Sequence, residues 1–288
     1  MAVVGGALAL AWLLVGQTPS IPGAPEPPKD YVCPMDRDVR SSKPGKCPRC
    51  GMTLVLGIPD PIEYPLNLSL IPRVPKPGER VELTFQVKDP KTGAPVSQFE
   101  LVHEKLFHMF IVSQDLDFFL HDHPVASGTG TFRYSGILSK AGMYRVLADY
   151  YPTDGTPQLT EKTIFVSGGS LQPAQLHPDR SAKHTENLQV ELTSEPPEPI
   201  AGFKTMLFFH LKPAEGLEKY VGAWGHMLAA SDDLIDLIHT HPFLANGGPD
   251  IQFNVIFPRA RTYRLWVQFQ RMGVVNTAVF TIPVSELK

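Results

Sequence analysis

Six histidines of this chain fall in two segments that are near-copies of each other. HMFIVSQDLDFFLHDHP begins at His108, HMLAASDDLIDLIHTHP begins at His226, and the two align without a gap. Both keep His-Met at the start, Ser and Asp in the middle and His-x-His-Pro at the end, while the apolar positions vary. Imidazole is the commonest metal ligand in proteins, so a repeat that holds three imidazoles at fixed spacing predicts metal binding, twice over.

The first segment is typical of a β-hairpin, because an apolar strand is followed by a polar turn and a second strand that ends at a proline. Closing the hairpin around Gln114 and Asp115 sets His108 directly across from His121. His123 lies two residues further along the same strand and therefore shares the face of His121. Opposed Cβ atoms lie ~5 Å apart and diagonal ones ~7 to 8 Å apart, so the three imidazoles can converge on one ion.

The second hairpin repeats this arithmetic and sets His226 across from His239, with His241 beside it. Neither turn contains Asn-Gly or Asp-Gly, so a four-residue loop of the same register is at least as compatible as a two-residue turn. The alternative to a metal site is a set of core histidines hydrogen-bonded to Asp115 or Asp233. In the metal interpretation the same two carboxylates can orient a ligand imidazole. We predict two separate, similar sites, each built within its own repeat.

Residues near the hairpins receive other interpretations. Met109 and Met227 each follow a ligand histidine, so on a regular strand they face the other way, into the core. His103 is predicted at the rim of the first hairpin, with a fourth-ligand role from a bulged strand as the alternative. The remaining histidines are predicted to be solvated or to be satisfied strand residues: His177, His184 and His210.

A second group of potential ligands lies near the N-terminus. All three cysteines of the chain, Cys33, Cys47 and Cys50, fall within YVCPMDRDVRSSKPGKCPRCGMTL. Three thiols cannot all pair internally, and the Cys-Pro-Arg-Cys spacing is typical of thiolate metal ligands. A disulfide between two of them is the alternative if the compartment is oxidising.

This segment resembles the small heavy-metal-binding domain found on copper-translocating P-type ATPases and on periplasmic subunits of metal efflux systems. That family follows the pattern Tyr-x-Cys-Pro-Met-His-Pro, then Lys-Pro-Gly-x-Cys-Pro-x-Cys-Gly-Met-x-Leu. The chain matches it from Tyr31 to about Val55, at Tyr31, Cys33, Pro34, Met35, Lys43, Pro44, Gly45, Cys47, Pro48, Cys50, Gly51, Met52 and Leu54.

The chain departs from the family where the pattern has His-Pro, because Asp36 and Arg37 stand there. A carboxylate is a harder donor than imidazole and suits Cu(I) poorly, so the fourth ligand stays open between Asp36 and none. The three cysteines can bind a soft ion alone or with thioether help from Met35 or Met52. The histidine repeats also resemble, more loosely, Ig-like domains that accompany this module in bacterial secreted and copper-handling proteins.

Length and composition predict a mainly β chain, with a small Cys-rich metal module followed by two tandem Ig-like β-sandwich domains. The repeats are offset by 118 positions, His108 to His226, which fits one sandwich of ~100 residues per copy. Proline supplies 29 of 288 residues, about twice the usual ~5%, and favours strands and linkers over helices. The predicted segments are a signal peptide or anchor at 1–16, a Pro-rich tether at 17–30, the metal module at 31–57, sandwich 1 at 58–168, a linker at 169–186 and sandwich 2 at 187–288.

The first residues, MAVVGGALALAWLLVG, fit a signal-peptide apolar region better than a spanning helix of ~20 residues, with an uncleaved anchor as the alternative. Either form predicts a periplasmic or secreted protein that meets a membrane only through this segment. A formal net charge of −3 without a basic run makes nucleic acid an unsuitable partner.

Together these patterns predict an extracytoplasmic protein that sequesters or transfers metal, with copper first and zinc as the alternative ion. A membrane efflux or metal-transfer protein is the expected protein partner. No nucleophile elbow, phosphate loop or dinucleotide fingerprint occurs in the sequence, so we expect no enzyme. Two alternatives stay open, namely a zinc or copper enzyme that uses a three-histidine site and a zinc-stapled adhesion or scaffold protein.

Overall fold

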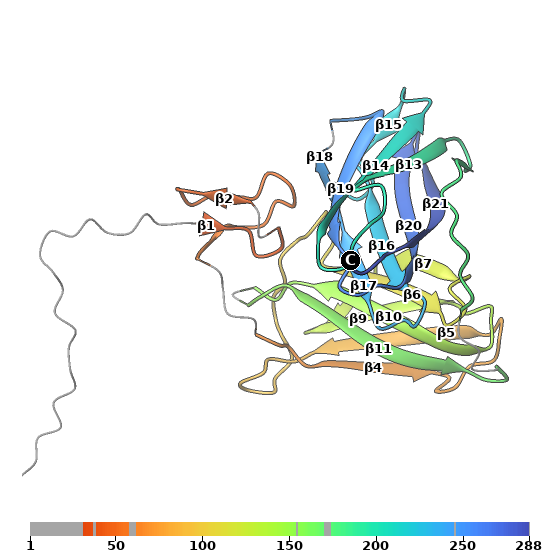
Figure 1. Cartoon of the computed structure of the whole chain (residues 1–288). Helices are drawn as coiled ribbons and strands as arrows, with labels where there is room; N and C mark the ends of the chain where they lie inside the picture. Colours follow the sequence, from red (N-terminus) through yellow and green to blue (C-terminus); the bar gives the residue numbers. More distant parts are fainter. Residues whose placement is uncertain are drawn as a thin grey trace, which may run out of the picture.

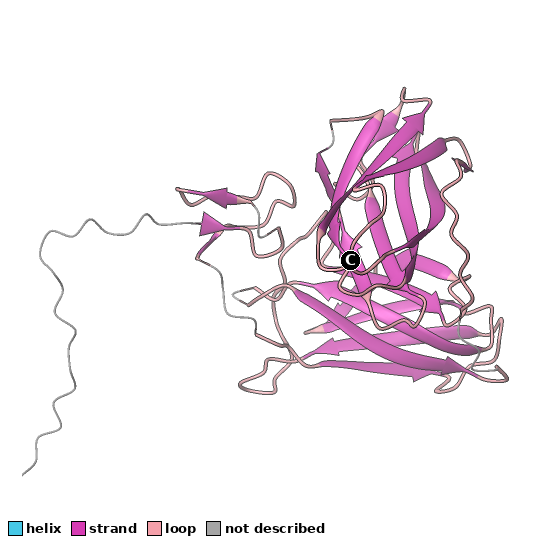
Figure 2. Ribbon diagram, in the orientation of Figure 1, coloured by secondary structure: helices cyan, strands magenta, loops and turns pink. Residues whose placement is uncertain are grey.

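The computed structural model describes residues 31–36, 39–57, 62–153, 155–169, 174–244 and 246–287. Within these ranges the secondary structure is entirely β, without a helix (Figure 2). The described part therefore also lacks any helix long and apolar enough to cross a membrane. The predicted signal or anchor segment and the Pro-rich tether lie outside the described residues.

The cysteine module is a small three-stranded antiparallel sheet. Its order is β2-β1-β3, formed by Tyr31–Val32 (β1), Arg40–Ser41 (β2) and Val55–Leu56 (β3). Two residues per strand give little apolar area to bury, so these pairings alone hold the module only weakly.

The first sandwich consists of two four-stranded antiparallel sheets. One has the order β4-β5-β9-β8, from Leu66–Ile71 (β4), Arg80–Val87 (β5), Thr131–Ile137 (β9) and Val125–Gly128 (β8). The other has the order β11-β10-β6-β7, from Gln158–Val166 (β11), Gly142–Tyr150 (β10), Phe107–Ser113 (β6) and Phe119–Asp122 (β7).

The second sandwich repeats this plan. One sheet has the order β12-β13-β14-β19-β18, from Lys183–His184 (β12), Gln189–Glu195 (β13), Lys204–Lys212 (β14), Asp250–Ile256 (β19) and Pro242–Leu244 (β18). In the other, β20 (Thr262–Arg271) pairs with β15 (Leu217–Glu218), β16 (His226–Ser231) and β21 (Val274–Pro283), and β16 pairs with β17 (Leu237–Thr240). Because β12 pairs with β13 in the first of these two sheets, the second sandwich begins inside the segment predicted as a linker, 169–186.

Period-two alternation explains why these segments are strands. β5 alternates between buried and less buried residues along its length, and β14 does the same. The buried positions fill one core inside each sandwich, and Met109 and Met227 lie in these cores, as predicted. The predicted fold class, a Cys-rich module followed by two Ig-like sandwiches, is confirmed.

A third apolar core joins the two sandwiches. β6 and β16 are buried on both faces, because one face points into its own sandwich and the other toward the partner sandwich. Phe110, Leu147, Leu228 and Trp266 lie in this shared core, and the ring of Phe119 stacks on Trp266 at 5.1 Å. Two sheets therefore face each other: the one with β6, β7 and β10 and the one with β16, β17 and β20. Figure 1 shows the second sandwich packed against the first. The histidine hairpins lie at this interface.

Candidate metal centres

The first hairpin closes one position later in the chain than predicted. Ser113 N donates to the Phe118 carbonyl and Phe118 N donates to the Ser113 hydroxyl, which makes a four-residue loop of Gln114 to Asp117. Leu116 adopts a left-handed φ of 59° within this loop. The register is therefore Phe110 opposite His121, and the predicted pairing of His108 with His121 is wrong. A shift of two residues preserves which side chains share a face, so the three imidazoles still point the same way.

The second hairpin has the same closure. Ser231 N donates to the Asp236 carbonyl, Asp236 N donates to the Ser231 hydroxyl, and Leu234 has a φ of 56°. Leu228 therefore lies opposite His239, so the predicted pairing of His226 with His239 is also wrong. Continued by two residues, these registers place His123 beside His108 in the first hairpin and His241 beside His226 in the second.

The first site gathers three imidazoles at the ends of β6 and β7. Nε2–H of His108 donates to the Val102 carbonyl at 2.9 Å, which leaves Nδ1 facing Nε2 of His123 at 3.2 Å. Nδ1–H of His121 donates to Oε1 of Gln268 at 2.7 Å, and its buried Nε2 has no hydrogen-bond partner among the described residues. One nitrogen from each histidine lies within 4.8 Å of the other two, which is a geometry able to hold an ion.

The second site reproduces this arrangement from β16, β17 and the residues that follow. Nε2–H of His226 donates to the Tyr220 carbonyl at 2.9 Å, and its Nδ1 faces Nε2 of His241 at 3.1 Å. Nδ1–H of His239 donates to Oδ2 of Asp149 at 2.7 Å, and within the described structure its buried Nε2 is unpartnered. These three histidines also offer ligand atoms within 4.8 Å of one another.

Asp149 and Gln268 hold equivalent positions in the two sandwiches. In the first, β10 pairs Asp149 with His108, and in the second, β20 pairs Gln268 with His226. Each side chain leaves its own sandwich and hydrogen-bonds a histidine of the other. A second hydrogen bond of this kind fixes the tautomer of a ligand imidazole and presents the opposite nitrogen to the metal.

The aspartates predicted to orient the ligands lie elsewhere. Asp115 accepts hydrogen bonds from Ser113 and Lys140, and Asp233 accepts them from Ser231 and Arg259. These contacts stabilise the turns of the hairpins rather than the imidazoles. The prediction that Asp115 or Asp233 contacts the histidines is therefore wrong. Sequence reasoning missed Asp149 and Gln268, although each stands five residues after the Tyr of a shared Tyr-Arg pair.

The two sites adjoin each other across the interface. The ring centroids of His121 and His226 lie 5.2 Å apart, and that of His108 lies 6.0 Å from His226 and 6.1 Å from His239. Each site takes its three ligands from one sandwich, as predicted. They are not separate in space, however, and each depends on a side chain of the other sandwich for orientation.

Burial lowers the pKa of five site imidazoles and so favours their neutral form, which is the form that binds metal. It lowers the pKa of His108 to about 4 and that of His123 to about 3, and it lowers the pKa of His121, His226 and His241 well below the ordinary value. Burial alone raises the pKa of Asp149, but the hydrogen bond from His239 and the nearby imidazoles outweigh it and hold that pKa below its usual range. The second site therefore contains a buried carboxylate where the first has a neutral amide.

His103 lies beside the second site. Its side chain is buried at 6% exposure, so the predicted rim position is wrong. The ring centroid lies 3.8 Å from that of His241 and 5.6 Å from that of His226, although His103 belongs to the first sandwich. Burial lowers the pKa of His103 to about 3.

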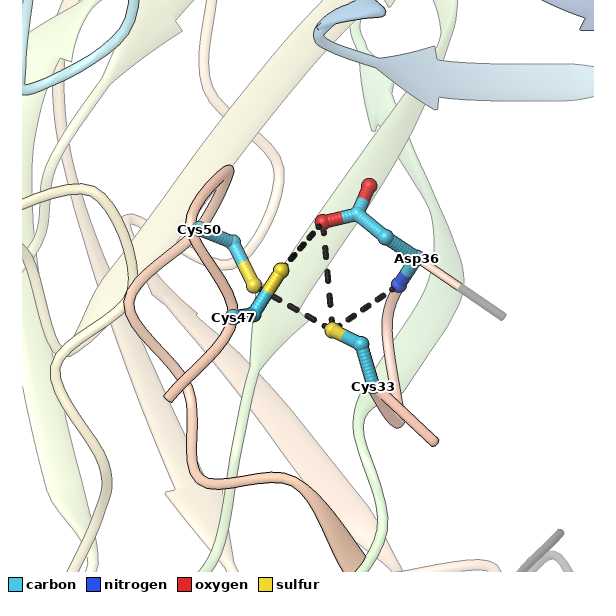
Figure 3. Close-up of side chains that lie close together, drawn as sticks. All are labelled: Cys33, Asp36, Cys47 and Cys50. Carbon is cyan, nitrogen blue, oxygen red and sulfur yellow. Dashed lines mark hydrogen bonds between the residues drawn. The ribbon is translucent and has the colours of Figure 1, made fainter. Parts of the chain in front are cut away.

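The cysteine module brings its predicted thiolates together with Asp36. Figure 3 shows the four side chains converging, with Cys33 Sγ 3.4 Å from Cys50 Sγ and Cys47 Sγ 3.4 Å from Asp36 Oδ2. One ligand atom from each residue lies within 4.8 Å of the other three. The cysteines are free thiols in this structure rather than a disulfide. Arg49 also contacts Asp36, at 3.2 Å.

The three cysteine thiols lie close together, and their pKa values are shifted in opposite directions. Hydrogen bonds from Cys33 and Cys50 lower the pKa of Cys47, while the hydrogen bond with Cys33 raises that of Cys50. Burial raises the pKa of Asp36 to about 6, against the opposing effect of Arg49. One thiolate among close thiols is a site ready for a soft cation.

Met35 and Met52 pack in the small apolar cluster around the cysteines, with Met52 almost fully buried. Of the other histidines, His210 hydrogen-bonds Asp250 at 2.6 Å, and His177 and His184 are exposed. These placements agree with the strand and solvated roles predicted for them.

The same two repeats emerge from comparison with known families. The family model described as Domain of unknown function (DUF8832) matches residues 63–168 and again 183–286, more than half of the chain. The chain belongs to this family. A DUF8832 repeat thus corresponds to each histidine-bearing sandwich, and a heavy metal binding domain model matches residues 31–55. The second match confirms the resemblance noted from the cysteine motif and shows that a heavy metal binding domain precedes the DUF8832 pair.

Among curated proteins, none matches this DUF8832 chain. Solved structures with some likeness include the Yersinia pseudotuberculosis adhesin InvE, at 10% identity and a TM-score of 0.25, covering 75% of this chain and 58% of that one. The Escherichia coli adhesin FdeC has 15% identity and a TM-score of 0.26, covering 82% and 71%. A two-domain fibronectin type III segment of chicken tenascin has 9% identity and a TM-score of 0.23, covering 77% and 99%. The chain thus spans 58% of the first of these structures.

Proposed function

We propose that this protein is an extracytoplasmic metal carrier, most suited to copper, which sequesters ions or passes them to a membrane efflux or metal-transfer protein. The observation that carries the proposal is the presence of three groups of ligand atoms, each within 4.8 Å, on one chain. One group is rich in cysteine and two are built of imidazole. Thiolates suit Cu(I), and imidazole clusters accept Cu(I), Cu(II) or Zn(II), so copper fits all three groups.

We further propose carriage rather than catalysis. The two histidine sites are near-equivalent neighbours, and duplicated sites serve storage better than a single reaction centre does. Every histidine of a site makes a ring hydrogen bond, to a carbonyl, to Asp149, to Gln268 or to a neighbouring imidazole. Such bonds orient ligands for binding.

Metal analysis tests this function directly. Protein purified from its native compartment should contain copper in excess of zinc. Apo-protein titrated anaerobically with Cu(I) should bind about three equivalents, one of them with a thiolate-to-copper absorption band in the near ultraviolet. A protein that retains its fold but binds no ion would contradict the proposal.

A further inference from the structure

The cysteine module is docked against both sandwiches. Val102 and Tyr151 of the first sandwich belong to the same apolar cluster as the three cysteines. The guanidinium of Arg49 lies 4.7 Å from the ring centroid of Phe243, in the second sandwich. These contacts place the thiolate site beside the histidine site that contains His241.

Two cavities lie between the module and that histidine site. One, of about 270 Å³, is lined by Met35 and Asp36 on the module side and by Asp149, His239 and His241 on the other. The other, of about 380 Å³, is lined by Pro48 and Arg49 together with His103, His241 and Phe243. The first cavity thus borders residues of both ligand sets, Asp36 on one side and His239 and His241 on the other, and His241 also lines the second cavity.

His103 stands between the two ligand sets. Val102, the preceding residue, packs against the cysteines, while the imidazole of His103 lies against His241. Its Nε2 is buried and has no hydrogen-bond partner within the described structure. A buried ring nitrogen without a partner is costly, and a passing cation would satisfy it.

The turn that carries His103 does not require a histidine. Val102 and Lys105 exchange backbone hydrogen bonds at 2.9 and 3.0 Å around it, and His103 has a φ of 46°. The equivalent turn of the second sandwich is closed by Tyr220 and Ala223 and has Val221 at a φ of 47°. The same backbone thus accepts valine, and the imidazole at position 103 is free to serve another purpose.

The geometry points to direct ion exchange within one chain, in which His103 carries a monovalent copper ion between the cysteine site and the site of His226, His239 and His241. This inference rests on the proposed function. The copper keeps its oxidation state, because each copper–sulfur bond that breaks is replaced by a bond to a neutral imidazole nitrogen. The thiolate left behind takes a proton from water. In the reverse direction, from imidazole to cysteine, the copper–nitrogen bond breaks, the thiol returns its proton to water and a copper–sulfur bond forms. Binding to Nε2 of His103 before the last thiolate leaves keeps the ion coordinated throughout.

Rapid mixing tests the exchange. The full chain is mixed anaerobically with one equivalent of Cu(I) in a weak acetonitrile complex, and the thiolate-to-copper absorption is followed. We expect a fast capture phase and a slower phase in which copper first bound by imidazoles reaches the thiolates. The rate of the slower phase should not change with protein concentration. His103→Val, which copies the residue of the equivalent turn, should slow that phase at least tenfold, whereas the exposed-histidine control His177→Val should not.

His103→Gln provides a second variant if valine impairs folding, and it should slow the same phase. A trace with capture alone, a slow phase that accelerates with protein concentration, or a slow phase unchanged in both His103 variants would overturn the exchange. A wild-type protein that shows no thiolate band at all would instead contradict the proposed function. The two failures are therefore distinguishable.

Discussion

Asp149 of the first sandwich accepts a 2.7 Å hydrogen bond from His239 of the second. The reciprocal contact, from His121 to Gln268, has the same length. The two histidine sites are therefore related by a local twofold arrangement. The two contacts differ in the acceptor, which is a carboxylate oxygen in one and an amide oxygen in the other.

This difference predicts unequal affinities. Asp149→Asn preserves the hydrogen bond but removes the negative charge that makes the His239 imidazole a stronger donor, so the second site should weaken roughly 10- to 100-fold. Gln268→Glu should strengthen the first site. Competition titrations with a Zn(II) chelator on both variants check this. Equal effects of Asp149→Asn on both binding steps would contradict the assignment.

Single ligand deletions should separate the sites. His121→Ala should lower the metal stoichiometry by about one equivalent through the first site, and His239→Ala should do so through the second, since each histidine supplies a nitrogen to only one group. Calorimetry on both variants measures the loss, with His210→Ala as control, because His210 is partly exposed and belongs to neither ligand group. If either substitution empties both sites, the pair binds metal as one unit, and if neither changes binding, the histidines are structural.

Removal of the thiolates should be a local change. Cys47→Ser with Cys50→Ser should remove one copper equivalent, because the module has little apolar core beyond its ligands. The thermal transition of the sandwiches should stay within a few degrees of that of wild type, since their cores contain none of these cysteines. Unchanged copper stoichiometry in the double variant would count against the thiolate site.

Asp36 offers a gain-of-affinity test. Its carboxylate lies 3.4 Å from Cys47 Sγ and 3.8 Å from Cys33 Sγ, in the place where the related metal-binding domains have histidine. Imidazole is a better donor than carboxylate for Cu(I), so Asp36→His should tighten Cu(I) binding at the module. A chelator competition titration measures the change, and weaker binding would show that Asp36 is itself the preferred ligand.

The shared core predicts that the sandwiches stabilise each other. Trp266 is 3% exposed in this core, so Trp266→Ala should lower the free energy of unfolding by about 3–5 kcal/mol. Phe165→Ala is the matched control, because Phe165 is 52% exposed and its loss should cost far less. Urea denaturation followed by circular dichroism compares them. Equal losses would show that the interface contributes nothing.

Local patterns allowed the sequence to predict the strands, both hairpins and all three ligand groups. Alternation marks a half-buried strand, and repetition marks the ligand set, so both signals lie within short segments. The register was wrong because it depends on turn detail, namely the hydroxyl of Ser113 closing the loop and the left-handed conformation of Leu116. Neither a serine at the end of a strand nor a leucine in a loop marks such a turn in the sequence.

Local sequence patterns could not predict the contacts between the two sandwiches. Asp149 and Gln268 are two polar residues among several in β10 and β20, and their role exists only once the two sandwiches meet. The burial of His103 likewise depends on the second sandwich and on the docked module. Short-range patterns contain no information on which faces of two folded domains will pack together.

The core formed by Phe110, Leu147, Leu228 and Trp266 has a further consequence for how such a protein can vary. A lone repeat would expose this face to water and would favour a homodimer that buries it again. In a homodimer every substitution appears in both halves. Joining the repeats in one polypeptide removes that restriction, so that Asp149 can occupy the position where the other half has Gln268, and His103 the position where it has Val221. Covalent linkage thereby turns one symmetric pair of pockets into two pockets that can specialise independently.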